Sequence, residues 1–393
     1  MSFNHSNNKS KNDNSDNSHN DNTVSTDAET QNTNYKRTNI ESYNINSKFN
    51  QQFYMPPEWH TKQATFMEFP VRHEIWDNIN IARNAYANVA NAISEFEKVY
   101  MLVKHDAFKE AKTLCSSQIE LIEIEHDDSW MRDNGPTFVI NQHKTSSQKL
   151  VGINWNFNAW GEKYKPYNLD NQVATKILKK FDIDMINCSV TLEGGAFHVN
   201  GDGVLLATKE CILNKNRNNK KASGEYFTEQ DFELIFKKYL GIDKCIWLEL
   251  GLYGDETDGH IDNVACFASE NHIIIQGTQD KLDPNYAIFH DNLQTINSAT
   301  NLHDKNFDVT VLQAPPIRYH NNERLTLSYI NYYMVNSAII LPVFGDDAKH
   351  TDEMAVAKLK EIFPNRKIIA IDGSEIIKGG GNVHCITQQM PLL

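Results

Sequence analysis

An order of elements that repeats along the chain constrains the fold more than any other feature. In its clearest copy, residues 194–199 and 203–213 flank an NGDG turn, the amphipathic stretch 227–240 follows, and the apolar run 244–250 ends the unit. The turn predicts a hairpin, the spacing of apolar residues predicts a helix, and the last run predicts a strand. This copy is therefore predicted to be a strand–strand–helix–strand (ββαβ) unit.

The same order recurs elsewhere, at 136–190, 263–314 and 327–373. An opening unit contains 64–70, 81–97 and 99–104, and residues 382–387 (NVHCIT) are predicted to supply its missing first strand. Because such units cannot each bury both faces alone, five of them are expected to close around a pseudo-fivefold axis. An open α/β sheet would also fit the alternation, but no helix is predicted within the hairpins, which argues against a purely parallel doubly wound sheet.

Amino-acid composition separates an N-terminal tail from the rest of the chain. Residues 1–50 are rich in Asn, Ser, Asp, Thr and Lys and poor in aliphatic side chains, so they are predicted to form a disordered tail, and 51–393 a single domain. The net charge of −13 disfavours nucleic acid as a partner and mildly favours cationic ligands. No apolar run approaches the ~20 residues that cross a bilayer, and the six cysteines lack CxxC spacing, so we expect a cytoplasmic protein with no membrane partner.

Unusual polar residues occupy related places, just before or within the first strand of a unit. They are Asp133, Glu193, His260, Asp262 and Cys385, and all five are expected to converge on the axis. Taken singly, such a histidine is more often structural and such a cysteine is more often a small buried side chain. Together they form a poor core, because buried ionised groups are costly without cationic partners. Few arginines or lysines lie nearby in the sequence, so a cationic substrate is the expected partner.

Arg132 is the exception, since it adjoins Asp133. Successive residues of a strand point to opposite faces, so Arg132 is predicted to face away and to pair with Asp127 or Asp128.

Seven segments together carry a family resemblance. They are residues 55–70, 127–138, 156–164, 192–203, 210–218, 251–263 and 379–391, which include DDSWMRDNGPTF, GLYGDETDGHIDN and GGGNVHCITQQMP. In this order the segments resemble agmatine deiminases, which are members of the guanidino-group-modifying superfamily, over essentially everything after the tail. The resemblance implies the pentein fold, a five-bladed α/β propeller of ββαβ units. Departures are the Asn-rich tail and the lysine-rich insert at 215–227.

The resemblance also implies a role for each candidate residue. Cys385 resembles the nucleophile, His260 the acid–base, Glu193 its carboxylate partner, Asp133 and Asp262 the guanidinium holders, and Trp130 the aromatic wall beside the substrate. The expected reaction converts agmatine and water to N-carbamoylputrescine and ammonia, within putrescine biosynthesis, through a covalent thiouronium on the cysteine. No metal or other cofactor is expected, and a homodimer is expected from the resemblance alone.

Two questions stay open at this stage. A free cysteine has a pKa of about 8.5, so a positive group must stabilise the thiolate, and imidazolium His260 and the bound cation are both candidates. Free arginine or peptidyl-arginine is the nearest rival substrate. Arginine carries an α-carboxylate that would require a basic partner, whereas agmatine presents only a second cation. Asp255 and Glu256 would suit an amine, but a solvated acidic loop explains them equally well. A catalytically silent polyamine-binding protein is a rival from another class, which the presence of Cys385 and His260 disfavours.

Overall fold

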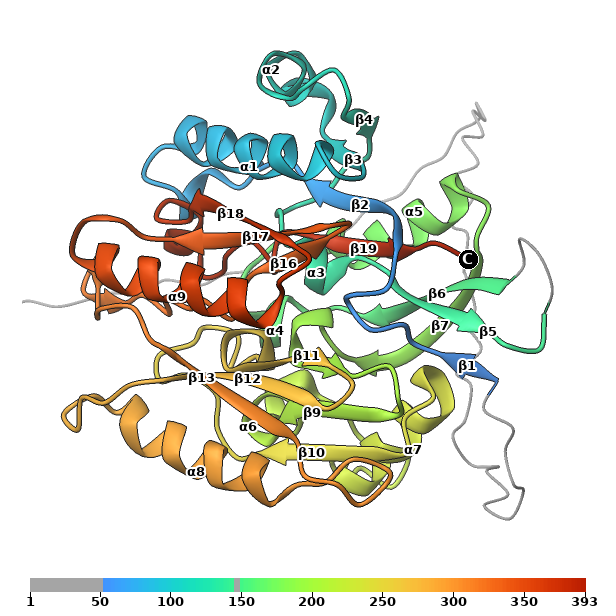
Figure 1. Ribbon diagram of the computed structural model, residues 1–393. Coiled ribbons are helices and arrows are strands. Elements are labelled where there is room, and N and C mark those ends of the chain that lie inside the picture. The colour runs from blue at the N-terminus through green and yellow to red at the C-terminus, as the bar shows by residue number, and fades with distance from the viewer. Residues whose placement is uncertain (1–51, 145–148) are drawn as a thin grey trace, which may run out of the picture. The chain divides into compact units, whose positions relative to one another are not determined.

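Strand pairing follows one pattern in five sheets of the part that the structure describes. The computed structural model describes residues 52–144 and 149–393 (Figure 1); the predicted disordered tail at 1–50 lies outside them. In each sheet, one strand runs antiparallel to a second, and the second runs parallel to a third that follows a helix. The predicted ββαβ order is therefore confirmed in all five units.

The bounds of the elements follow the order of the units. The first unit comprises β19 (Gln388–Pro391), β2 (Lys62–Glu68), α1 (Ile79–Ser94) and β3 (Lys98–Val103), and continues into α2 (Phe108–Leu114) and β4 (Glu120–Glu123). The second comprises β5 (Thr137–Asn141), β6 (Leu150–Asn156), α4 (Ala159–Glu162), α5 (Val173–Lys180) and β7 (Asp184–Thr191), with β1 (Phe53–Tyr54) at its edge. The third comprises β8 (Phe197–Val199), β9 (Val204–Thr208), α6 (Lys209–Ile212), α7 (Glu229–Leu240) and β10 (Lys244–Leu248).

The last two units complete the repeat. The fourth comprises β11 (Ala265–Ser269), β12 (His272–Gly277), α8 (Asn285–Ser298) and β13 (Asp308–Gln313). The fifth comprises β16 (Tyr333–Val335), β17 (Ala338–Val343), α9 (Lys349–Ile362) and β18 (Lys367–Asp372). A short hairpin of β14 (Tyr319–His320) and β15 (Glu323–Arg324) lies between them in the chain, and α3 (Met131–Asn134) precedes the second unit.

The long helices lie outside the strands and bury one stripe each (Figure 1). In α1, the side chains of Ala82, Tyr86, Val89 and Ile93 are fully buried, at the spacing of three to four residues that one helix face requires. Asn78 begins this helix, because its side chain accepts a hydrogen bond from the backbone N–H of Asn80. The middle strands are buried on both faces, as β17 is from Ala338 to Pro342.

The predicted first strand at 382–387 is wrong. These residues form turns instead, in which the N–H of Ile386 bonds to the carbonyl of Asn382 and the N–H of Thr387 to that of His384. The strand that pairs with β2 is β19, where Gln388 faces Phe66. Cys385 therefore lies just before a first strand, at the same place in its unit as the other candidate residues.

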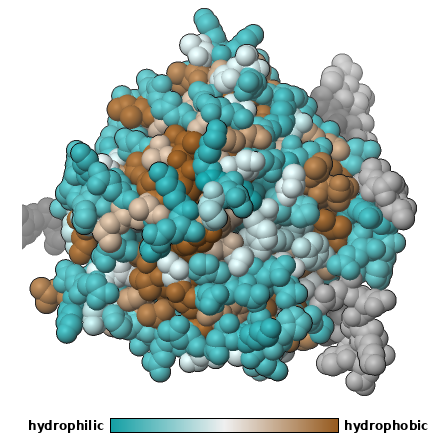
Figure 2. Space-filling model, in the orientation of Figure 1, coloured by the Kyte–Doolittle hydropathy of each residue, from teal (hydrophilic) through white to brown (hydrophobic). Residues whose placement is uncertain are grey.

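The face shown in Figure 2 is mostly hydrophilic, with separate apolar patches between polar side chains. Scattered apolar side chains are ordinary on a folded protein, so the homodimer stays a prediction. Among the described residues, no helix is both long enough and apolar enough to cross a bilayer.

Candidate active site

The segments that precede the first strands converge on one buried site. Asp133 lies in α3 before β5, Glu193 precedes the short helix Gly194–Ala196 before β8, and Asp262 lies in the short helix Ile261–Asn263 before β11. Glu193, His260 and Asp262 are at most 2% exposed, and Asp133 and Cys385 at most 5%. The structure therefore brings the five polar candidates together, from four different units.

Cys385 is surrounded by acceptors and an amide. Its Sγ lies 3.1 Å from Nδ2 of Asn331 and 3.6 Å from Oδ2 of Asp262. Burial and the carboxylates of Asp262 and Asp133 raise the pKa of the thiol well above its ordinary range, against the effect of Asn331. In this environment the protonated thiol is favoured.

Asn331 is a contact that the sequence did not reveal. It comes from the fifth unit, just before β16, in a stretch that was predicted to be strand already. Its Nδ2 also bonds to Oδ1 of Asn263, and its Oδ1 accepts the backbone N–H of His384. Asn331 thus fixes the backbone beside the thiol, and with it all five units contribute to the site.

His260 lies between two carboxylates without a hydrogen bond to either. Its Nδ1 is 3.8 Å from Oδ1 of Asp133, and its Nε2 is 3.7 Å from Oε2 of Glu193, so both buried ring nitrogens lack a partner. Burial alone would lower the pKa of His260, but Asp133, the thiol of Cys211 and Glu193 together raise it well above its usual value. This direction favours the imidazolium form, in which both N–H groups face carboxylates at distances too long for a hydrogen bond.

Glu193 stays ionised because an arginine is buried against it. Nε of Arg217 donates to Oε1 of Glu193 over 2.9 Å, and both side chains are 1% exposed. Burial would raise the pKa of Glu193, but Arg217 and His260 lower it to about 2. Arg217 also bonds to the Asp258 carboxylate and to the carbonyl of Thr257. The sequence reasoning missed this residue, which lies in the insert 215–227.

Asp133 and Asp262 differ in how their oxygens are occupied. Oδ2 of Asp133 accepts the indole N–H of Trp160 at 2.9 Å, and Oδ1 accepts the N–H of Gly195 at 3.0 Å. Burial and the carboxylates of Asp262 and Glu193 raise the pKa of Asp133 to about 6, against the effect of His260. Oδ2 of Asp262 contacts His384, whereas Oδ1 is buried without a partner. Asp262 therefore keeps one oxygen for a donor from outside the protein.

Two glycines lie where any side chain would collide with the site residues. A Cβ on Gly195 would lie 2.6 Å from Nδ1 of His260 and 2.9 Å from Oδ2 of Asp262. A Cβ on Gly381 would lie 2.6 Å from the Trp130 ring and 3.0 Å from Sγ of Cys385. Trp130 is accordingly beside the thiol, where it stacks on Trp76 with centroids 6.4 Å apart. Its role as an aromatic wall beside a substrate stays a prediction.

One group of described residues has the spacing of metal ligands. Glu193, Cys211 and His260 each offer an atom within 4.8 Å of the others. However, Arg217 lies against two of the three, with Nη2 3.6 Å from Sγ of Cys211. A divalent cation would compete with this guanidinium and with the imidazolium proton, so the donor set fits a metal poorly.

Three expectations about neighbouring residues need correction. Arg132 lies in a helix, not a strand, and its Nη1 bonds to Gln389 and lies 3.7 Å from Oε1 of Glu58 rather than pairing with Asp127 or Asp128.

Asp128 instead binds Arg72, and Asp127 accepts the N–H of Leu169. Asp255 is occupied by Thr257 and Asn263, so it is not free for an amine. Internal cationic partners also exist, in Arg217 and Arg132, which the sequence had seemed to lack.

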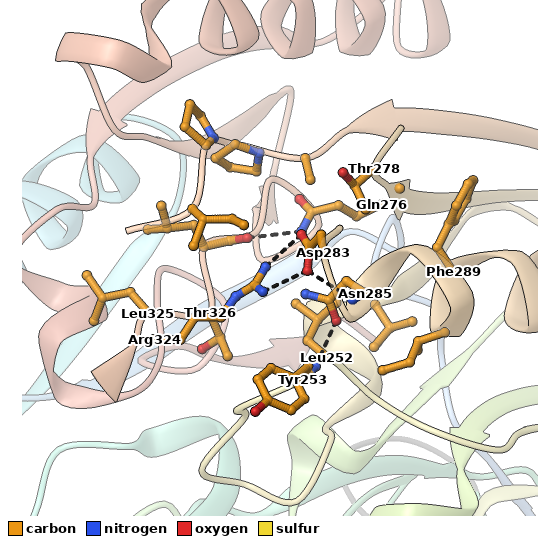
Figure 3. A pocket seen from close by; sticks show the side chains of 18 of the residues that line it. Leu252, Tyr253, Gln276, Thr278, Asp283, Asn285, Phe289, Arg324, Leu325 and Thr326 are labelled. Carbon is orange, nitrogen blue, oxygen red and sulfur yellow. Dashed lines mark hydrogen bonds and ion pairs between the residues drawn. The ribbon is translucent and has the colours of Figure 1, made fainter. Parts of the chain in front are cut away.

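A second pocket lies apart from the thiol (Figure 3). It is lined by Leu252, Tyr253, Phe289 and residues 314–317, and none of the candidate residues lines it. Its carboxylate, Asp283, is already paired with both Nη atoms of Arg324, at 2.7 and 2.8 Å. It therefore offers a guanidinium no free anion.

Known proteins are similar to this chain along most of its length. Residues 54–391 match the model of the Porphyromonas-type peptidyl-arginine deiminases. The chain is a member of that family. A relative from Legionella pneumophila is 41% identical over 352 residues, which is 88% of this chain and 98% of the relative.

Two further members carry a named activity. An agmatine deiminase from Medicago truncatula is 36% identical, over 87% of this chain and 97% of its own. The structure of the Enterococcus faecalis agmatine deiminase is 31% identical with a TM-score of 0.80, over 86% of this chain and 96% of that one. The resemblance read from the motifs and the mixed α/β fold are thereby confirmed.

Proposed function

We propose that this chain is an agmatine deiminase, which hydrolyses agmatine to N-carbamoylputrescine and ammonia in cytoplasmic putrescine biosynthesis. The observation that carries the proposal is the buried set of Cys385, His260 and three carboxylates, in which Oδ1 of Asp262 and both His260 nitrogens lack partners. Buried polar atoms without partners are costly, and a bound guanidinium with its N–H groups would satisfy the carboxylate.

Binding the cation would activate the nucleophile. A guanidinium stays protonated below a pH of ~12, so it must be held and polarised before attack. Asp133 and Asp262, the two carboxylates that hold the thiol pKa high, are the ones that the cation would neutralise. Burial, the larger cause of the raised pKa, remains, but a cation beside the sulfur would offset it as well as the carboxylates, so the thiol would release its proton to water as substrate binds. This favours the bound cation over His260 as the main source of the thiolate.

The remaining steps need one acid–base group. Sulfur would bond to the guanidinium carbon, and the C–N bond to ammonia would break as imidazolium His260 gives its proton to the departing nitrogen. Neutral His260 would next take a proton from water, whose oxygen adds to the thiouronium carbon. Breaking the C–S bond would then return the thiolate and form the carbonyl of the ureido product. The hydroxyl proton that came from the attacking water would leave to solvent. Glu193 would stabilise the charged ring at each stage, since Arg217 keeps it ionised.

The charges beside Gly380 support agmatine over arginine. A Cβ on Gly380, next to Gly381, would lie 3.1 Å from Oε2 of Glu256, which also accepts a hydrogen bond from the Tyr164 hydroxyl, so a carboxylate lies beside the glycine segment that approaches Cys385. Two lysines of the neighbouring segments are occupied: Lys163 binds the carbonyl of Glu256 and the carboxylate of Asp258, and Lys378 binds Glu375. A distal ammonium would meet an anion there, whereas the α-carboxylate of arginine would find neither of these two lysines free.

The architecture fits the same proposal. The five units share one pairing pattern, and the segments before their first strands meet at the site, as five blades around a pseudo-fivefold axis would arrange them. All six cysteines are free thiols, as a reducing cytoplasm requires.

A comparison of substrates tests the proposal. The purified full chain would be given agmatine, arginine and an arginyl peptide in parallel, and ammonia would be measured enzymatically. We expect ammonia from agmatine with a far higher kcat/KM than from either alternative. A higher kcat/KM for arginine or the peptide would reassign the substrate, and no ammonia from any of the three would reject a deiminase.

A further inference from the structure

A buried row of three charged side chains connects Asp262, through His384, to Glu58 near the start of the described residues. Nδ1 of His384 lies 2.8 Å from Oδ2 of Asp262, and Nε2 of the same ring lies 2.6 Å from Oε1 of Glu58. All three residues are less than 8% exposed. Glu58 lies near the start of the described chain, whereas His384 is the neighbour of Cys385, so the contact joins residues 326 positions apart.

The carboxylates on either side of His384 determine its protonation state. With a carboxylate against each nitrogen, the His384 ring donates twice, which requires the imidazolium form. Burial and Arg132 would lower the pKa of His384, but Glu58 and Asp262 raise it. Glu58 in turn has Nη1 of Arg132 and Nε2 of His198 at 3.7 Å from its Oε1. The groups facing His384 are thus Asp262, Glu58, Arg132 and the adjacent Cys385.

The contact also orients Asp262. Because Oδ2 is held by His384, the carboxylate cannot rotate freely, and its buried Oδ1 has no hydrogen-bond donor among the residues that the structure describes. The backbone of His384 is fixed as well. Its N–H donates to Oδ1 of Asn331, and its carbonyl accepts a hydrogen bond from Nε of Arg132. A shift of this ring would therefore move the carboxylate and the loop that carries the thiol together.

We propose that His384 and Glu58 are positioning residues of the deiminase: they keep Asp262 ionised and oriented to hold the guanidinium. The inference rests on the proposed function for its kinetic part. It predicts that changes at either residue act through Asp262, with the larger effect at His384, which touches Asp262 directly. In Glu58→Gln, His384 still donates to Asp262 but loses the anion that favours its proton.

The test compares pH profiles of the full chain. In His384→Asn, a donor to Asp262 can remain but the positive charge is gone, so the pKa of Asp262 rises. We expect kcat/KM for agmatine near pH 7 to fall about tenfold to a hundredfold, because one charge-assisted contact is weakened. The acid limb of the kcat/KM profile, which Asp133 with its pKa of about 6 also shapes, should become steeper and move to higher pH as Asp262 titrates alongside Asp133, with partial recovery of activity in alkali. Glu58→Gln should move the limb in the same direction by less.

His126→Asn is the matched control. His126 is equally buried, but its two nitrogens bond only to the backbone carbonyls of Ile124 and Phe69. This variant should lose stability without moving the acid limb. If His384→Asn lowers stability as His126→Asn does and leaves the limb in place, the residue is merely structural and the inference is wrong.

A second measurement does not depend on turnover. ¹⁵N NMR of the substrate-free chain, with His384 assigned by comparison with His384→Asn, should show protons on both ring nitrogens at neutral pH. A neutral His384 ring would overturn the inference even if agmatine is the substrate. A doubly protonated ring in a protein without deiminase activity would instead reject only the proposed function.

Discussion

Replacing Arg217 with methionine should be among the most damaging changes near the site. The substitution keeps much of the volume but leaves Glu193 buried without its cation. The pKa of Glu193 falls from its ordinary 4.5 to about 2 in the folded chain, which corresponds to roughly 3 kcal/mol. Removing one partner of a buried pair typically costs ~3–5 kcal/mol, so the two estimates agree. We expect the free energy of unfolding to fall by about that amount.

A double-mutant cycle separates the ion pair from the packing of Arg217. In Glu193→Gln with Arg217→Met, no buried charge is left alone, so stability should recover by about 2 kcal/mol or more relative to Arg217→Met. Urea unfolding at pH 7, followed by tryptophan fluorescence, supplies the four free energies. Arg318→Met is a control for loss of an arginine, because Arg318 pairs with an Asp347 that is mostly exposed; it should cost about 1 kcal/mol.

The pH dependence of this effect has a defined sign. Since the pKa of Glu193 is depressed in the folded chain, its contribution to stability is complete above 4.5 and is lost as the pH falls towards 2. The gap between wild type and Arg217→Met should therefore narrow in acid. A loss below 1 kcal/mol at pH 7, or additive costs in the double variant, would refute the view that Arg217 is what keeps Glu193 ionised.

Three further changes test the site itself. Cys385→Ala should abolish turnover but bind agmatine about as tightly as wild type in calorimetry, because the carboxylates remain; ammonia release near the wild-type rate would remove Cys385 from the chemistry. Trp160→Phe removes a donor to Asp133, so the acid limb of kcat/KM should rise above a pH of about 6, and an unmoved limb would show that Asp133 does not govern it. Glu256→Gln should raise KM for agmatine about fivefold and leave butylguanidine, which lacks the amine, unchanged; equal effects on both would place the amine elsewhere.

The sequence predicted the repeat because each unit carries strong local signals. The NGDG turn and the helical spacing in α7 are readable without any partner, and the structure places both as expected. The stretch 382–387 shows the limit of such signals. Its apolar side chains are buried in turns as completely as they would be in a strand, so burial pattern alone cannot distinguish the two.

Partners that lie far apart in the chain were harder to predict. Arg217 belongs to a segment of lysines and asparagines that is typical of a solvated loop, and only the fold reveals that it faces Glu193. Glu58 and His384 both lie in motifs that were recognised, but their contact depends on closing the first and last segments together. The role of Asn331 was hard to predict for another reason. It lies in an apolar run that predicts a strand, whereas β16 begins only at Tyr333.

Trapping the covalent intermediate tests the central claim most directly. The full chain would be mixed with agmatine, quenched in acid within milliseconds to seconds, digested and analysed by mass spectrometry. The account predicts an adduct of the amidino carbon and its aminobutyl chain, lacking one ammonia, on the peptide that contains Cys385 and on no other cysteine. Steady ammonia release from agmatine by a Cys385→Ser variant that forms no such adduct would contradict it.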